Sequence, residues 1–72
     1  MAIYIEHTVI YHVSITYLKE GTHKHTEICY ANEDEIAELT SAALVKNDWD
    51  CAYVTKIDRD GGEQLIMIVT RE

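Results

Sequence analysis

The stretch IYIEHTVIYHVSITY at residues 3–17 decides the fold class of this chain. Its odd-numbered positions are apolar or aromatic with the single exception of His7, and most of the positions between them are polar. A period of two places these two sets on opposite faces of a β-strand. A strand with one apolar and one polar face is typical of an antiparallel sheet that buries one side.

The rest of the chain predicts a second strand, one helix and a second hairpin. The first strand ends near Leu18, and a turn at residues 19–22 and a second strand at residues 23–31 follow it. A third strand at residues 50–57, a turn at residues 58–62 and a last strand at residues 64–70 complete the order ββαββ. We therefore predict an α+β fold in one domain, residues 1–72, with one helix packed on a four-stranded, mostly antiparallel sheet.

The helix between the hairpins has signals at both ends. Asn32 is a good N-cap, and Glu35 stands three positions later, as in a capping box. Asn47 is the expected left-handed cap at the C-terminal end. The residues with the helical spacing of a buried stripe are Ile36, Leu39, Thr40 and Ala43, widened by Ala37 and Leu44.

Two features raise the question of self-association. A straight strand at residues 3–17 would span about 50 Å, whereas a domain of this size is about 30 Å across. The strand must therefore bend or bulge, with residues 7–8 as the expected position, or break, or pair with another chain. The run LIMIV at residues 65–69 is apolar on both faces, so we expect the last strand in the centre of the sheet or under a partner. A homodimer through a sheet edge or face is one solution, and a bulged strand in a monomer is the other.

The charge of the chain limits its partners. Thirteen acidic and six basic side chains give a net charge of −7. Nucleic acid and anionic membranes are therefore not expected as direct partners, because both are bound through Lys and Arg. We expect a cytoplasmic protein with Cys29 and Cys51 as free thiols, since no signal peptide or membrane-spanning run is recognisable.

The acidic side chains are concentrated around the helix. Residues 32–60 hold eight acidic and three basic side chains, which predicts an acidic surface that docks on a basic groove of another protein. Helix capping and solubility are the alternative explanation. Trp49 is expected to be a packing anchor, with an exposed interface role as the alternative. The candidate partner-binding residues are Glu33, Asp34, Glu35, Glu38, Asp48, Trp49 and Asp50.

A second candidate site is a metal site on the second strand. His23, His25 and Glu27 alternate along the strand, so they are expected on one face, and two histidines with one carboxylate suit a metal ion. The alternative is an exposed, hydrated strand. We find no Gly-rich phosphate loop, no strained nucleophile turn and no Ser or Cys with an identifiable base, so neither an enzyme nor a cofactor is expected.

The second half of the chain carries a resemblance. Ile36, Leu39 and the run LVKNDWD at residues 44–50, followed by a hairpin that ends in Arg71 and Glu72, resemble a family of small bacterial and phage domains of unknown function. That family combines an amphipathic helix, a Gly-Trp-Glu corner and a hairpin, and here Asp48 stands where it has Gly. The first thirty residues do not match, and the resemblance implies no catalytic residue.

In its size, its charge and its lack of a catalytic motif, the chain is also similar to inhibitors encoded by phages and mobile elements, such as anti-CRISPR and anti-restriction proteins. This similarity implies a non-enzymatic inhibitor whose acidic surface docks on the nucleic-acid-binding groove of a host protein. The alternatives are a homo-oligomeric structural or small-ligand-binding scaffold and a small metal-binding protein.

Overall fold

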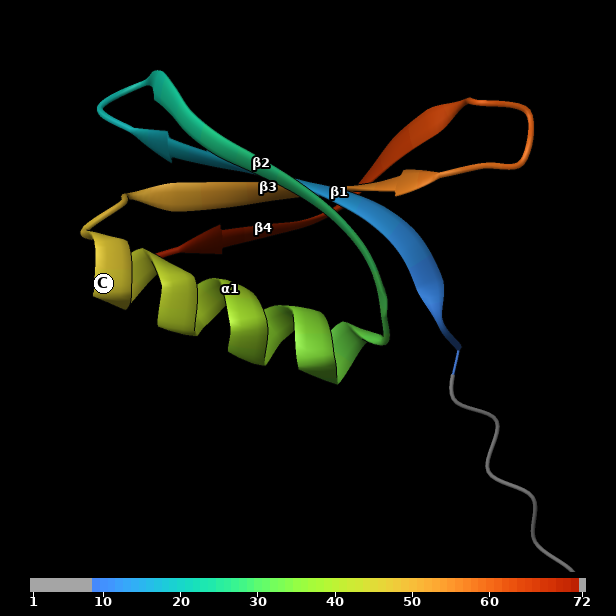
Figure 1. Ribbon diagram of the computed structural model, residues 1–72, viewed down its shortest axis with the longest axis horizontal. Coiled ribbons are helices and arrows are strands. Elements are labelled where there is room, and N and C mark those ends of the chain that lie inside the picture. The colour runs from blue at the N-terminus through green and yellow to red at the C-terminus, as the bar shows by residue number, and fades with distance from the viewer. Residues whose placement is uncertain (1–8, 72) are drawn as a thin grey trace, which may run out of the picture.

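The computed structural model describes residues 9–71, which form four strands and one helix. The elements are, in chain order, β1 (Tyr11–Lys19), β2 (Thr22–Ala31), α1 (Glu33–Asn47), β3 (Cys51–Ile57) and β4 (Glu63–Thr70). The strands form one antiparallel sheet in the order β2-β1-β3-β4, and α1 runs along one of its faces (Figure 1). The predicted α+β fold with the order ββαββ is confirmed. Within the described part of the chain, α1 lacks the length and the apolar character needed to cross a membrane.

The alternating pattern of β1 builds the core. The odd-numbered residues Val13, Ile15 and Tyr17 are fully buried on the face that α1 covers. These side chains are in the middle of the sheet because β1 pairs with β2 on one side and with β3 on the other. The remaining buried apolar residues come from the helix and the flanking strands, and they are Ala31, Ile36, Leu44, Ala52 and Val54.

The helix begins as predicted. The backbone N–H of Glu35 donates to Asn32 Oδ1 at 2.8 Å, and the backbone N–H of Asn32 donates to Glu35 Oε1 at 3.2 Å, which completes the capping box. The predicted end is wrong by one residue, because Asp48 takes the left-handed conformation with φ 57°. Asn47 belongs to the helix, and its side-chain amide donates to the carbonyl of Ala43.

The buried stripe of α1 differs from the expected one. Ile36, Thr40 and Leu44 are buried, whereas Leu39 is 42% exposed. Leu39 is about 100° around the helix from Thr40, so it turns away from the sheet. Thr40 can be buried because its hydroxyl donates to the carbonyl of Ile36 at 2.7 Å. The predicted stripe is therefore correct for Thr40 and wrong for Leu39.

The hairpins contain one tight turn and two bulges. Glu20 and Gly21 both have positive φ values, 51° and 76°, as a two-residue type I′ turn requires. Tyr17 pairs with His25 and Leu18 with His23, so Lys24 is an extra residue in β2. Val54 pairs with Met67 and Thr55 with Leu65, so Ile66 is an extra residue in β4. The bulge expected at residues 7–8 lies outside the described residues.

Two expectations about strand position are corrected. β4 is an edge strand that pairs only with β3 within residues 9–71, so its two apolar faces do not reflect a central place in the sheet. β1 begins at Tyr11, and Val9 and Ile10 are not part of it, although the apolar alternation extends back to residue 3. Residues 3–8 lie outside the described part. Nine strand residues span about 30 Å, which the domain accommodates.

Candidate functional site

Asp48 connects three parts of the fold. Its carboxylate accepts from Lys19 Nζ of β1 at 2.6 Å and from Arg71 Nη1, just after β4, at 2.5 Å. Lys19 Nζ also donates to the backbone carbonyl of Asp48 at 2.8 Å. These hydrogen bonds lower the pKa of Asp48 to about 2, and the same contact raises the pKa of Lys19. Asp48 therefore has two counter-ions inside its own chain, although it was predicted to contact a partner.

Asp50 has a second structural role at the same corner. Its Oδ2 accepts from the backbone N–H of Glu20 in the β1–β2 turn at 2.6 Å. Its backbone N–H donates to the carbonyl of Leu18, and its backbone carbonyl accepts from Arg71. Asp50 thus holds the first hairpin against the start of β3, and its carboxylate oxygen is used for this contact.

Trp49 lies between these two acids and packs inward. Its ring centroid is 4.9 Å from that of Tyr17 and 5.9 Å from that of His25. The side chain is half-buried on the helix side of the sheet. This geometry agrees with a packing anchor at the corner between helix and strand.

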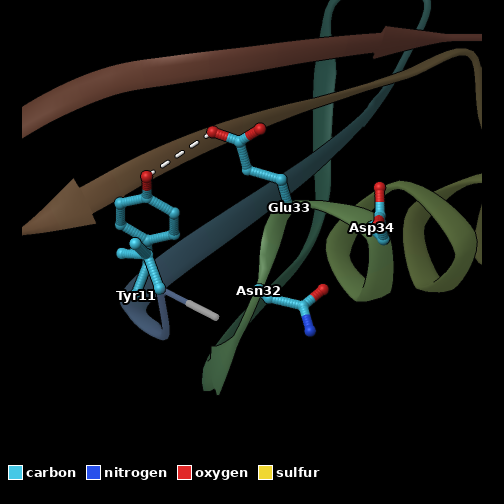
Figure 2. Close-up of a pocket in the computed structure, with 5 residues that line it drawn as sticks. Tyr11, Asn32, Glu33 and Asp34 are labelled. Carbon is cyan, nitrogen blue, oxygen red and sulfur yellow. Dashed lines mark hydrogen bonds between the residues drawn. The ribbon is translucent and has the colours of Figure 1, made fainter. Parts of the chain in front are cut away.

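The acids in the first turns of α1 have fewer contacts within the described residues. Glu35 is committed to the capping box, and Glu33 accepts a long hydrogen bond of 3.5 Å from the hydroxyl of Tyr11 (Figure 2). Asp34 and Glu38 form no ion pair or side-chain hydrogen bond with any residue from 9 to 71. Glu33 and Asp34 also line a shallow hollow together with Val9, Tyr11 and Asn32 (Figure 2).

The predicted partner-binding residues therefore do not form one patch. Asp34 and Asp48 are at opposite ends of α1, about 21 Å apart along the helix axis. At the N-terminal end the carboxylates of Asp34 and Glu38 are exposed and unpaired within residues 9–71. At the C-terminal end Asp48 and Asp50 form contacts that stabilise the fold. The sequence could not distinguish these roles because the counter-ions of Asp48 are remote in the chain.

The expected metal site is not assembled within the described residues. The bulge at Lys24 places His23 opposite Leu18 and His25 opposite Tyr17, so the two histidines belong to opposite faces of the sheet. The prediction that both share a face with Glu27 is therefore wrong. His23 Nε2 is 2.6 Å from Thr26 Oγ1, and no three metal-ligating side chains gather between residues 9 and 71.

Cys29 and Cys51 are both free thiols, as predicted. Cys29 is opposite Val13 in β1, whereas Cys51 is opposite Leu18, so the two cysteines belong to opposite faces of the sheet. Partial burial raises the pKa of the Cys29 thiol, which disfavours the reactive thiolate.

A second surface was recognised only in part from the sequence. Five of the nine large apolar residues that are exposed in the described chain are on the sheet face opposite α1, with exposed fractions from 38% to 72%. The sequence indicated this surface in β2, where the apolar residues Ile28 and Tyr30 share a face with the polar positions of β1. Tyr30 also stacks on His12, with ring centroids 4.5 Å apart. The five residues are Ile28, Tyr30, Tyr53, Leu65 and Ile68.

We compared the chain with known proteins at the level of sequence and of structure. No family model, no curated protein and no solved structure matches it. The resemblance to small bacterial and phage domains therefore remains a prediction, and the two surfaces described above are the basis for any inference about function.

Proposed function

We propose that this protein is a small non-enzymatic protein-binding module. Its exposed acidic side chains at the start of α1 would dock on a basic surface of another protein. The most concrete form of this proposal is an inhibitor of the phage or mobile-element type, in the anti-CRISPR or anti-restriction class. Such an inhibitor would occupy the basic nucleic-acid-binding groove of a host protein.

The observation that supports the proposal is that two acids at the start of α1 have no counter-ion in the part of the chain that the structure describes. Asp34 and Glu38 are exposed, and within residues 9–71 no Lys or Arg pairs with either of them. They are four positions apart, so both project from one side of the helix and repel each other. A basic partner would relieve this repulsion, and the net charge of −7 would steer it towards the protein.

The contact residues in this proposal are fewer than those that the sequence suggested. Glu33, Asp34 and Glu38 have exposed carboxylates that are available to a partner, and Glu33 accepts only the long 3.5 Å hydrogen bond from Tyr11. Glu35, Asp48 and Asp50 are not included, because each carboxylate already accepts a hydrogen bond that stabilises the fold.

The proposal is tested with a capture experiment on a bacterial lysate. The immobilised protein is incubated at low and at high salt, and bound proteins are identified by mass spectrometry. We expect a nucleic-acid-binding protein that is retained at low salt and lost at high salt, because exposed charge pairs are screened. The captured protein is then purified, and its affinity is measured directly.

A charge-reversed variant and a matched control decide the mechanism. Asp34→Lys combined with Glu38→Lys should weaken binding of the purified partner by about tenfold or more. Glu20→Lys combined with Glu63→Lys makes the same change in net charge at two exposed sites away from α1 and should bind almost normally. Circular dichroism confirms that both variants are folded. Equal loss in both variants would show a general charge effect, and no loss in either would contradict the proposal.

A further inference from the structure

One face of the sheet has no covering element within residues 9–71. The helix lies along the other face (Figure 1). The side chains that point away from it are exposed or partly exposed on all four strands. We call this surface the helix-free face. Following the strand pairs from β2 to β4, its two central rows are Ile28–Ser14–Thr55–Leu65 and Thr26–Thr16–Tyr53–Ile68. The flanking rows are Tyr30–His12, Ile57–Glu63 and His23–Leu18–Cys51–Thr70.

In these rows Glu63, the first residue of β4, is the one residue with a carboxylate, and none carries an ammonium or guanidinium group. This is unusual for a chain with a net charge of −7, whose acids are concentrated around α1 and the loops. A strongly acidic partner would find no counter-charge in these rows, and a strongly basic partner would find only Glu63 at the edge. An occupant of this face must therefore be mainly apolar and uncharged where it makes contact.

We propose that a second copy of this chain covers the helix-free face, so that two sheets pack face to face in a symmetric homodimer. A second copy supplies a surface of the required chemistry, because its own helix-free face is equally apolar and is uncharged in its two central rows. A twofold axis brings the same face of both subunits together, so the helix-free face of each subunit is covered by that of the other. The result is a four-layer arrangement of helix, sheet, sheet and helix.

This geometry also solves the problem of charge repulsion between two acidic chains. Packed sheets are about 10 Å apart, and each helix layer is about 10 Å beyond its own sheet. The two α1 helices would thus be about 30 Å apart, which exceeds the Debye length of about 8 Å at physiological salt several-fold. Association through the helix face would instead bring the two acidic helices into contact.

The size of the face is sufficient for a specific interface. Four strands spaced about 4.8 Å apart and about seven residues long present about 440 Å² of projected area. Two copies together give about 900 Å² of flat area. The accessible area is larger because side chains protrude from the sheet, and a specific interface needs roughly 1,000 Å². The exposed large residues lie on both edge strands as well as on β3, so the contact would extend across the whole sheet.

The homodimer does not depend on the proposed acidic docking function. The exposed acids of α1 are on the opposite side of the sheet and would remain accessible in the dimer. The two interactions also respond differently to salt. Docking through Asp34 and Glu38 should weaken as salt rises, whereas an apolar interface between two acidic chains should be unaffected or become tighter.

Sedimentation equilibrium of the full chain over a series of concentrations tests the homodimer. The wild-type protein should pass from the monomer mass to twice that mass as concentration rises. Ile28→Lys and Ile68→Lys each place a charge on one edge strand of the helix-free face, and we expect the dissociation constant to rise about a hundredfold. Val45→Lys is the matched control, because Val45 is 69% exposed on α1 and Ile28 is 62% exposed on β2.

The possible results divide clearly. Dimerisation that Ile28→Lys and Ile68→Lys weaken and Val45→Lys leaves unchanged supports the proposal. A wild-type protein that keeps the monomer mass at every concentration overturns it. So does a dimer that both face variants leave intact, because the interface would then lie elsewhere, for example at the β4 edge. Thermal melts followed by circular dichroism establish that each variant is folded before its mass is interpreted.

Discussion

The hydroxyl of Tyr17 provides the sharpest test of the core. Tyr17 is 1% exposed, and its hydroxyl oxygen is buried without a hydrogen-bond partner among the described residues. A buried hydroxyl that has lost water without gaining a partner destabilises the folded state by about 1–3 kcal/mol. The substitution Tyr17→Phe removes this oxygen and leaves the ring, which packs 4.9 Å from the ring of Trp49.

We expect Tyr17→Phe to raise the free energy of unfolding by about 1 kcal/mol. The expected gain is at the lower end of the range for an unsatisfied polar group, because removal of the oxygen also leaves a small void with fewer dispersion contacts. For a domain of this size, 1 kcal/mol corresponds to a rise in Tm of about 4–8 °C. Most core substitutions destabilise a protein, so the sign alone is informative.

The pH dependence gives a second readout of the same oxygen. Burial raises the pKa of Tyr17 above its ordinary value of 10.0, with a smaller contribution from Glu27. The part of the stability that depends on a neutral Tyr17 is therefore fully present below about pH 10. It is lost as the pH rises through the higher folded-state pKa. Phenylalanine does not ionise, so the advantage of Tyr17→Phe should increase above pH 10.

Urea unfolding followed by the fluorescence of Trp49 measures both effects. Tyr30→Phe is the control at a protein concentration low enough for the monomer, since Tyr30 is 72% exposed there and its substitution should change stability by less than about 0.5 kcal/mol. If Tyr17→Phe were destabilising by 1 kcal/mol or more, the hydroxyl must have a partner in the folded protein, and the reasoning would be wrong.

Three further predictions concern the helix ends and the histidines. Asn32→Ala should lower the free energy of unfolding by about 1 kcal/mol through loss of the capping box, whereas Asn47→Ala should have little effect, as measured by urea unfolding. Asp48→Asn should lower the Tm at pH 7. The difference in Tm between wild type and variant should shrink as the pH falls from the usual pKa of 3.8 towards the folded-state pKa of about 2, because wild-type Asp48 also becomes neutral there. Addition of excess zinc should leave the Tm unchanged, because His23 and His25 belong to opposite faces of the sheet, and a large rise would contradict the strand register.

Local signals in the sequence were sufficient for most of the fold. The alternation in residues 11–17, the cap at Asn32 and the glycine turn after Lys19 are each determined by near neighbours in the chain. Each of them specifies its element through backbone geometry or through the period of the side chains. These features therefore predicted the order ββαββ without knowledge of the tertiary structure.

The errors arise where a distant contact decides the result. Lys24 bulges out of β2, and this single extra residue moves His23 to the other face, which no local pattern indicated. Leu39 is exposed although it was expected in the buried stripe with Thr40, because burial depends on how α1 is rotated against the sheet. Asp48 has counter-ions 29 and 23 residues away in the chain, so it could be assigned to the acidic surface only by composition.

The place of β1 between β2 and β3 has a consequence for how the chain folds. The β1–β2 and β3–β4 hairpins close short loops, whereas the β1–β3 pair joins residues such as Ser14 and Thr55, 41 positions apart. A two-stranded hairpin is only marginally stable by itself, and closing a long loop carries a larger entropy loss than closing a short one. Neither half of the protein is therefore expected to persist alone, and docking of β1 on β3 should limit the folding rate. The central strand pair thus makes folding a single cooperative event.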